Sequence, residues 1–388
     1  MTRILSLLLF AGLLFSGASP ARAGDNAWEK VALDGVHIVS LAGDPARPAT
    51  LYAATSQGLK KSLDSGAAWS DLGEILPGKL LPSALAVSPL NSKELYAAYD
   101  GGGIFKSVDG GNSWQAINDG LPNLNVRCIV ISPKDPNLLY IGIQDGVAIS
   151  TNGGKRWHLS SGFKRSVNVN CIAIDPKNPQ FMYAGTGGAG VFKSGNGGVS
   201  WVDRNQGLSS LSILALHIDP ENPDIVLAGA YHPATPTDFY VGEASGGAFR
   251  TTDGGRTWEG TELLNITIFS FVADALYPGA VYAGAWGGAY RSADGGASWS
   301  DINSGLNNPF LHAIRILPVR PPVILAGTTF GLLSYTDKDI AGLLDKGGGG
   351  FNFVLPGLAA GAAGIAALIF LVRRRRKKTS EEASRPVW

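Results

Sequence analysis

A short segment ending in tryptophan recurs six times along this 388-residue chain. Each copy is an octet that begins with Ser or Thr, has Asp or Asn at its third position and Gly at its fifth, and ends in Trp. Successive tryptophans are 45, 43, 44, 57 and 41 residues apart, a period that indicates one repeat architecture rather than two ordinary domains. The octets occupy residues 62–69, 107–114, 150–157, 194–201, 251–258 and 292–299.

Short strands surround each octet and divide the repeats into seven units. Upstream segments such as LYAA, LYIG and VYAG are rich in residues that favour strands. One unit is expected to place strands at residues 128–131, 139–143 and 147–150, and an outer strand from Trp157. Twelve positions before the second residue of each upstream strand the residue is always small, as expected near the crowded axis of a closed ring. These seven residues are Ser40, Ala84, Cys128, Cys171, Ala215, Ser270 and Ala313.

The pattern predicts an all-β fold, a single seven-bladed β-propeller over residues 24–340. The seventh unit has Asp337 at the octet position, but no Trp follows it. Trp28 precedes Ser40 by 12 residues, as Trp258 precedes Ser270. We therefore expect residues 28–33 to form the outer strand of the last blade, so that the two ends of the domain close one sheet.

The octets resemble the Asp-box, or BNR, repeat of sialidases, xyloglucan-degrading endoglucanases, sortilin-type receptors and a photosystem II assembly factor. The resemblance implies that these turns lie at the rim opposite an active site. Asp or Asn can accept hydrogen bonds from its own turn, Gly supplies a positive φ, and Trp packs between sheets. Because Asn cannot act as an acid or base, we interpret these residues as structural. They are Asp64, Trp69, Asp109, Trp114, Asn152, Trp157, Asn196, Trp201, Asp253, Trp258, Asp294 and Trp299.

Function is expected on the other face, in the loops between second and third strands and between outer and inner strands. The longest interval between tryptophans, 57 residues, contains an insertion at residues 231–246 that is either a specific contact or a solvated decoration. Candidate ligand-face residues are Tyr99, Gln144, Tyr231, His232, Asp238, Tyr240, Glu243, Trp286 and Phe330, with Gln57 and Thr186 in equivalent turns.

A glycoside hydrolase is the alternative function. Such an enzyme needs two carboxylates at a defined separation, and Asp100 and Asp145 lie at matching turns of adjacent units. The sialidase resemblance implies an arginine triad and an early Arg-Ile-Pro motif, but the nearest string here is residues 315–318 in the last unit. Arg127 and Arg165 could reach the same face. We assign no catalytic residue and treat the two aspartates only as candidates.

Composition argues against several other classes of protein. The 32 basic and 31 acidic residues nearly cancel, so no nucleic-acid partner is expected. The five histidines lack metal-ligand spacing and no phosphate-binding loop occurs, so neither a metal nor a cofactor is expected. Cys128 and Cys171, the only cysteines, occupy small-residue positions. We expect free thiols, although an exported protein could form a disulfide.

The chain ends predict export and a membrane anchor. Residues 1–23 have a basic start, an apolar run and a small-x-small cleavage site, which are typical of a signal peptide. Residues 353–372 lack charge and, at about 1.5 Å per residue, can cross a hydrocarbon core of about 30 Å. A Gly-rich linker at residues 341–352 precedes this span. The basic residues 373–388 follow it and are expected to be cytoplasmic. Processing of this segment as a sorting signal is an alternative.

These observations favour a single-pass membrane protein whose extracytoplasmic propeller is a recognition or assembly module. Its expected ligand is a protein or a glycan. A sialidase-like or glucanase-like hydrolase acting on cell-surface or environmental glycans is the competing interpretation.

Overall fold

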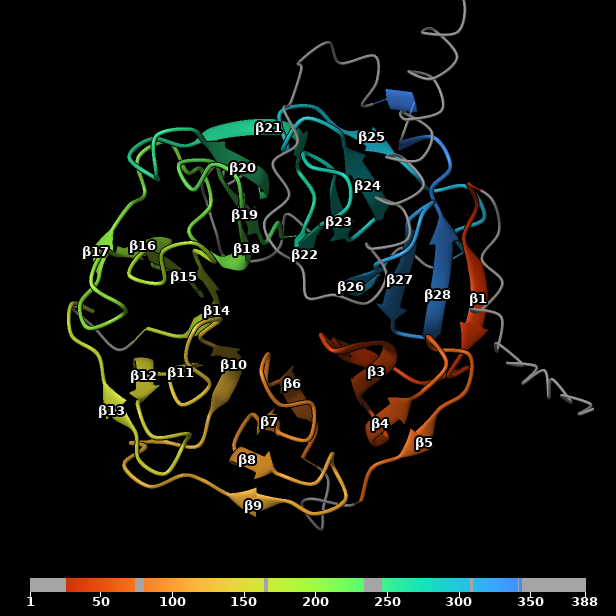
Figure 1. Cartoon of the computed structure of the whole chain (residues 1–388). Coiled ribbons are helices and arrows are strands. Elements are labelled where there is room, and N and C mark those ends of the chain that lie inside the picture. Colours follow the sequence, from red (N-terminus) through yellow and green to blue (C-terminus); the bar gives the residue numbers. More distant parts are fainter. Residues whose placement is uncertain are drawn as a thin grey trace, which may run out of the picture. The chain divides into compact units, whose positions relative to one another are not determined.

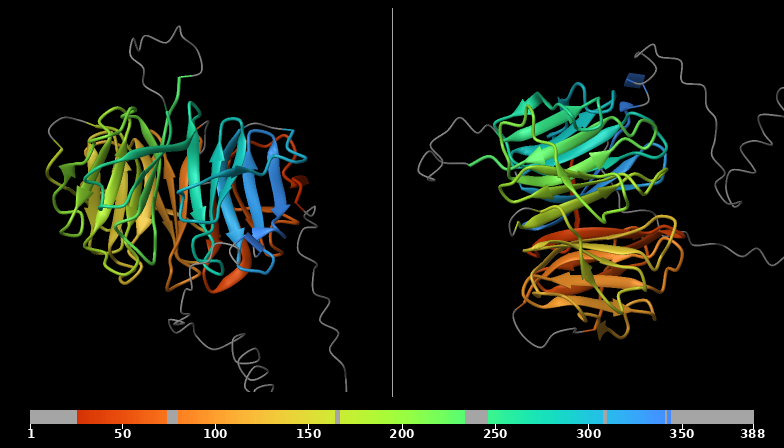
Figure 2. Two further views of the ribbon diagram at one scale, coloured as in Figure 1. Left: turned by 90° about the horizontal axis from the view of Figure 1, so that it is seen from above. Right: turned by 90° about the vertical axis from the view of Figure 1, so that its left-hand side faces the viewer.

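The computed structural model describes residues 26–73, 80–163, 167–233, 246–307, 310–340 and 342–343. Within this part of the chain, seven four-stranded antiparallel sheets surround a common axis, as Figure 1 shows. Figure 2 shows that the strands run between two faces that carry the connecting loops. The described chain is therefore a seven-bladed β-propeller, as the repeats predicted.

The strands of each blade follow one another in sequence from the axis outward. Blade 1 contains β2 (Ile38–Asp44), β3 (Arg47–Thr55), β4 (Gly58–Ser62) and β5 (Ser70–Asp71). Blade 2 contains β6 (Pro82–Val87), β7 (Leu95–Tyr99), β8 (Gly103–Ser107) and β9 (Gln115–Ala116). Blade 3 contains β10 (Val126–Ile131), β11 (Leu139–Ile143), β12 (Gly146–Ser150) and β13 (His158–Leu159).

The next three blades repeat this order. Blade 4 contains β14 (Val169–Ile174), β15 (Met182–Thr186), β16 (Val191–Ser194) and β17 (Val202–Asp203). Blade 5 contains β18 (Ile213–Ile218), β19 (Val226–Ala230), β20 (Gly247–Thr251) and β21 (Glu259–Leu264). Blade 6 contains β22 (Ile268–Ala273), β23 (Val281–Ala285), β24 (Gly288–Ser292) and β25 (Ser300–Asp301).

Blade 7 joins the beginning and the end of the domain. Its three inner strands are β26 (Leu311–Leu317), β27 (Val323–Thr328) and β28 (Gly331–Thr336), and its outermost strand is β1 (Glu29–Ala32), antiparallel to β28. Figure 1 shows β1 in red beside β28 in blue. The Trp28 ring packs 5.3 Å from that of Tyr335. The prediction that residues 28–33 close the last blade is confirmed, with the strand itself at 29–32.

The seven small residues predicted near the axis each lie directly after a register shift in the inner strand. Each pairs with Ala or Gly on the second strand. A carbon added to Gly185 would collide with Ile213, and one added to Gly327 would collide with Ile38. The small pairs therefore leave room for a branched side chain of the neighbouring inner strand, which is a more specific reason than crowding at the axis.

Two of these positions are cysteines, and both thiols are free. Burial raises the pKa of Cys128 to about 12 and that of Cys171 well above its ordinary value. Thiols with such pKa values are protonated and unreactive at neutral pH. They pack the inner strands, as expected.

The six octets form closely similar turns, here called octet turns. In each, the Ser or Thr hydroxyl donates to the Asp or Asn Oδ1 at 2.7–2.9 Å, and the residue before Trp donates its amide to the same oxygen at 2.9–3.0 Å. Asn152 and Asn196 accept these bonds just as the aspartates do. Hydrogen bonds from the Ser113 hydroxyl and amide hold the pKa of Asp109 far below its ordinary value. The octet carboxylates are thus structural acceptors, as proposed from the sequence.

At four octets, the residue before the octet links its blade to the next blade. Lys61, Lys106, Lys193 and Arg250 each donate to a glycine carbonyl in the following octet turn, at 2.8–3.3 Å. In blade 3 this position is Ile149, and the Tyr140 hydroxyl donates to Gly197 O at 3.0 Å instead.

At the closing blade the link is an ion pair. Arg291 meets the buried Asp337 at 2.7 Å, and the Tyr282 hydroxyl donates to the same carboxylate at 2.8 Å. The degenerate seventh octet has therefore kept its aspartate as a buried partner for blade 6.

The predicted signal peptide (1–23), membrane span (353–372) and basic tail (373–388) lie outside the described residues, as does all of the linker (341–352) except residues 342–343. Within the described ranges, no helix is long and apolar enough to cross a membrane.

Candidate recognition face

The turns between second and third strands and the segments that lead into the inner strands share one face of the propeller, here called the mouth face. Isolated bridges join a turn of one blade to the start of the next inner strand at Asp100–Asn125, Gly187–Ser212 and Trp286–Phe310. The octet turns lie at the opposite ends of the strands, on the octet face. The structure therefore separates the structural repeat from the variable loops.

Polar side chains occupy the mouth face over blades 2 and 3. Asp100 pairs with Arg127 at 3.6 Å. The Asn125 Nδ2 donates to Gln144 Oε1 at 2.7 Å, and the Asn123 Nδ2 donates to Asp145 Oδ2 at 2.5 Å. This polar half, Asp100, Asn123, Asn125, Arg127, Gln144 and Asp145, is a hydrogen-bonded network that crosses the junction between two blades.

The two candidate catalytic carboxylates belong to this network. Asp100 is exposed and faces a guanidinium, while the half-buried Asp145 accepts from an amide. A glycosidase general acid normally lies in an apolar site that keeps it protonated. Neither carboxylate lies in such an apolar site, because each already contacts a polar side chain of the network.

Aromatic rings occupy the mouth face over blades 6, 7 and 1. Trp286 lies 4.9 Å from Phe310, and Phe310 lies 6.3 Å from His312. The His312 ring in turn lies 4.8 Å from both Phe269 and His37. We call these five residues the aromatic cluster. It is continuous across three blades.

The two histidines of the cluster are neutral at physiological pH. Burial, together with the nearby His37, lowers the pKa of His312 to about 4. Burial also lowers the pKa of His37. The His312 Nε2 lies 3.4 Å from Thr329 Oγ1, which connects the cluster to the turn that carries Phe330. The aromatic cluster is therefore an uncharged surface.

Several predicted ligand-face residues do lie at this face. Trp286 is 37% exposed, Tyr231 is 38% exposed and Phe330 is 63% exposed. Gln57 and Gln144 are exposed, and His232 is half-buried with its amide donating to Thr267 Oγ1. Asp238, Tyr240 and Glu243 lie outside the described residues.

Tyr99 was assigned to the ligand face, and this was wrong. It is 4% exposed and lies edge-on to Phe105 within the core between blades 1 and 2. It is the last residue of β7, and Thr55, Ile143 and Thr186 end the equivalent strands and are buried as well. Thr186, placed in a turn by the sequence, donates to Gly190 O and stabilises that turn from inside.

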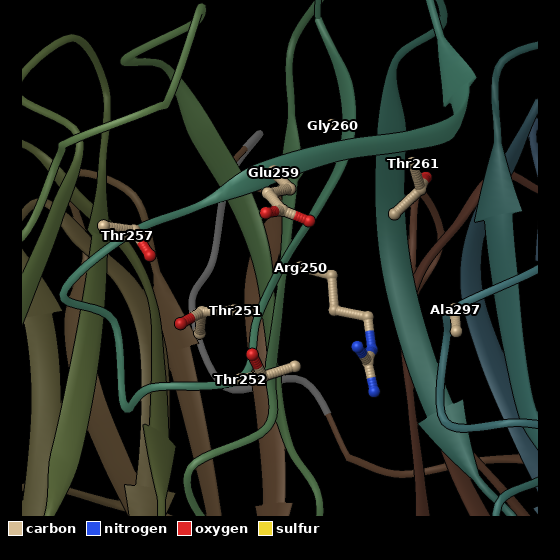
Figure 3. Close-up of a pocket in the computed structure, with 8 residues that line it drawn as sticks. All are labelled: Arg250, Thr251, Thr252, Thr257, Glu259, Gly260, Thr261 and Ala297. Carbon is tan, nitrogen blue, oxygen red and sulfur yellow. The ribbon is translucent and has the colours of Figure 1, made fainter.

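A pocket of about 180 Å³ lies away from the mouth face, on the outer rim between blades 5 and 6 (Figure 3). It is lined by the octet turn of blade 5, β21 and Ala297 of the next octet turn. Arg250 reaches across it, and its Nε donates to Gly295 O. Because Arg250 is already used to link two blades, we interpret this pocket as a gap at a blade junction.

Sequence reasoning missed most of the aromatic cluster. Phe269 and His312 each directly precede one of the seven small residues, a position filled by Val39, Ser83, Arg127, Asn170 and Leu214 in the other blades. Aligning the seven units at this position would have shown an aromatic side next to a polar side. His37 and Phe310 precede the inner strands of blades 1 and 7 and would have extended the same side.

These features define a class of protein. It is a seven-bladed propeller whose octet face carries hydrogen-bonded turns and whose mouth face is polar on one side and aromatic on the other. No protein-family model matches the chain, and no curated protein sequence matches it. The comparisons with solved structures therefore stand on the fold alone.

Three solved propellers illustrate the range of proteins with this fold. YCF48 bound to D1 peptide has a TM-score of 0.60 at 16% identity, covering 82% of this chain and 99% of that one. The Niastella koreensis GH74 enzyme has a TM-score of 0.56 at 18% identity, covering 78% and 52%. The extracellular domain of a putative one-component system from B. thetaiotaomicron has a TM-score of 0.61 at 15% identity, covering 79% and 39%.

The chain spans about half the length of the GH74 enzyme but nearly all of YCF48. Propellers of this shape thus include an enzyme, a peptide-bound protein and the extracellular domain of a putative one-component system. The fold does not choose among these functions, and the choice depends on the site.

Proposed function

We propose that this chain is a recognition module that binds a polypeptide partner through its mouth face and does not hydrolyse glycans. The observation that carries the proposal is the aromatic cluster with its exposed Trp286, on the same face as the exposed Phe330 and a hydrogen-bonded polar half. Exposed aromatic residues next to satisfied polar groups are typical of protein interaction sites. The solved complex of YCF48 with a peptide supports a propeller of this size acting in this way.

The membrane topology predicted from the sequence belongs to the same proposal. We propose that residues 1–23 direct export, that the propeller is extracytoplasmic and that residues 353–372 anchor it. The described chain leaves the propeller after β28, on the octet face, where Asn26 donates its amide to Thr336 O.

Capture from native membranes tests the proposal. The soluble fragment 24–346, immobilised and incubated with solubilised membranes of the source cells, is expected to retain a defined set of proteins. A Trp286→Ala/Phe330→Ala double variant is expected to lose them. Phe181→Ala is the matched control, because this aromatic residue is 40% exposed on the octet face. Equal capture by the double variant and wild type would contradict the proposal.

A hydrolysis assay tests the glycosidase alternative. We expect no activity on a panel of sialylated, xyloglucan and other β-glucan substrates. Activity that is abolished by Asp100→Asn or Asp145→Asn would instead identify the propeller as a hydrolase.

A further inference from the structure

We propose that the mouth face binds an extended, uncharged polypeptide segment that places an aromatic or large aliphatic side chain on the aromatic cluster and lays its main chain over the amide side chains of the polar half. This inference rests on the proposed function and specifies the chemistry of the partner. The aromatic cluster would hold a side chain of the partner, and the polar half would hold its main chain.

The shape of the aromatic cluster limits the kind of group that can pack on it. The planes of Trp286 and Phe310 are inclined by 43°, those of His312 and Phe269 by 49°, and those of His312 and His37 by 52°. Pyranose rings stack best on a flat aromatic face, and three of the four ring pairs in this cluster are tilted, while Phe310 and His312 are nearly parallel at 14°. Tilted rings offer both faces and edges, which suits an aromatic or branched side chain that packs edge-to-face.

The charges on the mouth face limit the kind of partner segment that can bind. The histidines of the cluster are neutral, and of the three charged residues of the polar half, Asp100 and Arg127 face each other. Asp145 accepts a hydrogen bond from Asn123. A charged partner segment would lose its hydration against the rings without meeting a counter-charge there, whereas an uncharged segment loses little. The surface is therefore complementary to a segment without charged side chains.

The polar half contains amide side chains that are held in place by hydrogen bonds. Asn125 and Gln144 bond each other, and Asn170 donates to Ile213 O across the junction between blades 4 and 5. These bonds fix the amide side chains in place, so they do not have to be ordered when a partner binds. Carboxamides present both a donor and an acceptor, which match the two polar groups of a peptide unit. An extended main chain crossing blades 3 and 4 would meet these groups while its side chain rests on the rings.

Selection from a random peptide library displayed on phage tests the inference with the soluble fragment 24–346, which contains the whole closed ring. Twelve-residue peptides enriched on the wild type are expected to carry at least one aromatic or large aliphatic residue and to be depleted in Asp, Glu, Lys and Arg. Synthetic copies of two enriched peptides are expected to bind the Trp286→Ala/Phe330→Ala variant at least 30-fold more weakly. Phe181→Ala should bind them within about twofold of wild type.

A second variant separates the two sides. Asn125→Ala/Gln144→Ala should weaken the same peptides about fivefold while the preference for an aromatic residue persists. Unfolding midpoints of all variants within a few degrees of wild type would show that folding is preserved. If the double aromatic variant does not fold, Trp286→Ala alone serves, because that ring belongs to the aromatic cluster and is 37% exposed.

Three outcomes overturn the inference: enriched peptides dominated by charged residues, no enrichment, or enrichment that both variants leave unchanged. In those cases, capture of native proteins that still depends on Trp286 and Phe330 would leave the proposed function standing. Loss of that dependence as well would remove both. Binding to a glycan array through Trp286 would show that the mouth recognises carbohydrate instead.

Discussion

The seven junctions between blades fall into two groups that differ in how they hold the same residue. At junctions 2/3, 3/4, 4/5 and 6/7 the tryptophan is 1–3% exposed, and its indole donates to the preceding blade. At junctions 7/1, 1/2 and 5/6 the tryptophan is half-buried, and its indole donates to a glycine carbonyl of its own octet turn. The buried group is Trp157, Trp201, Trp258 and Trp28, and the half-buried group is Trp69, Trp114 and Trp299.

A tetrapeptide after the outer strand accounts for the difference. It reads Asn or Ser, any residue, Gly, then Leu or Phe, and occurs at residues 118–121, 160–163, 205–208 and 303–306. The second residue accepts the tryptophan amide, and the glycine, with φ between +75° and +101°, lies directly against the tryptophan main chain. In three of the four, Asn accepts an amide from the third strand of its blade at 2.7–2.8 Å. The remaining three junctions lack this sequence.

The same octet motif therefore occurs at two different kinds of junction. The octet fixes its own turn, while the loop of the preceding blade decides whether the tryptophan is buried. We call the two groups clamped and unclamped junctions. We expect the clamped junctions 2/3, 3/4 and 4/5 to be the most stable arc of the ring, and the unclamped junctions to be the places where it opens first.

The largest expected difference comes from removing the indole. Trp157→Ala should destabilise the soluble fragment by about 4 kcal/mol, because the ring is fully buried between blades and leaves a cavity. Trp114→Ala should cost about half as much, since its ring is already half-solvated. Urea unfolding followed by circular dichroism measures both. Equal losses would break the distinction between clamped and unclamped junctions.

A smaller effect is expected from the glycine of the clamp. Gly207 has φ +92°, and a side-chain carbon there would collide with the Trp258 carbonyl, so Gly207→Ala should cost about 2–3 kcal/mol. Gly73 follows the outer strand at an unclamped junction, has no positive φ, and a carbon on it would lie 3.7 Å from Asn112 O. Gly73→Ala should therefore change the free energy of unfolding by less than about 0.5 kcal/mol. A comparable loss at both positions would remove the clamp as an explanation.

The clamp also shows what the sequence could and could not reveal. The octet period was sufficient to predict seven blades, their order and the closing strand, because these depend on local turn chemistry repeated at fixed intervals. The tetrapeptide and the basic residue before each octet are equally local and could have been found by aligning the units. Neither was used.

The mouth was harder to predict for a physical reason. His37, Phe269 and His312 belong to three different repeats and meet only because the ring brings successive inner strands side by side. Polarity alone could not place Tyr99, since the end of the second strand points into the core although a turn begins one residue later. Turn residues could thus be predicted from the sequence, but the direction in which they point could not.

The octet carboxylates offer a third and milder test of the two groups. Every unclamped octet has Asp, while two of the clamped octets have Asn. Asp294→Asn at junction 5/6 should cost less than about 1 kcal/mol at pH 7, because Asn152 and Asn196 accept the same bonds. Asn152→Asp is the reciprocal control at a clamped junction.

Asp294→Asn and wild type should differ in their stability at acid pH. Burial opposes the charge of Asp294, but hydrogen bonds from Ser298 and Ser292 outweigh it and lower its pKa. A carboxylate whose folded pKa is depressed stabilises the fold above its unfolded pKa of about 3.9, and this contribution is lost as the pH falls further. Unfolding midpoints measured from pH 5 to pH 2.5 should therefore fall less steeply for Asp294→Asn than for wild type. A steeper fall would show that Asp294 is protonated more easily in the folded protein.

A pH-dependent effect is expected at the unclamped junction 7/1, where His37 and His312 face each other across the closure of the ring. Burial and the neighbouring His37 lower the pKa of His312 to about 4, below the value of about 6.5 for an unfolded chain. The unfolded state therefore binds more protons between these values, so this junction should lose stability as the pH falls from about 6.5 to about 4 and little more below that. His312→Phe keeps a ring against Phe269 and His37, and it should flatten the pH dependence of stability between about pH 6.5 and pH 4. His217→Phe in blade 5 is the comparison, because burial lowers the pKa of His217 as well. Hydrogen exchange of the inner strands at pH 7 and pH 5 provides the spatial readout: faster exchange at pH 5 confined to β2 and β26 places the weakness at junction 7/1, whereas equal acceleration around the ring would mean that the closing junction is no weaker than its neighbours.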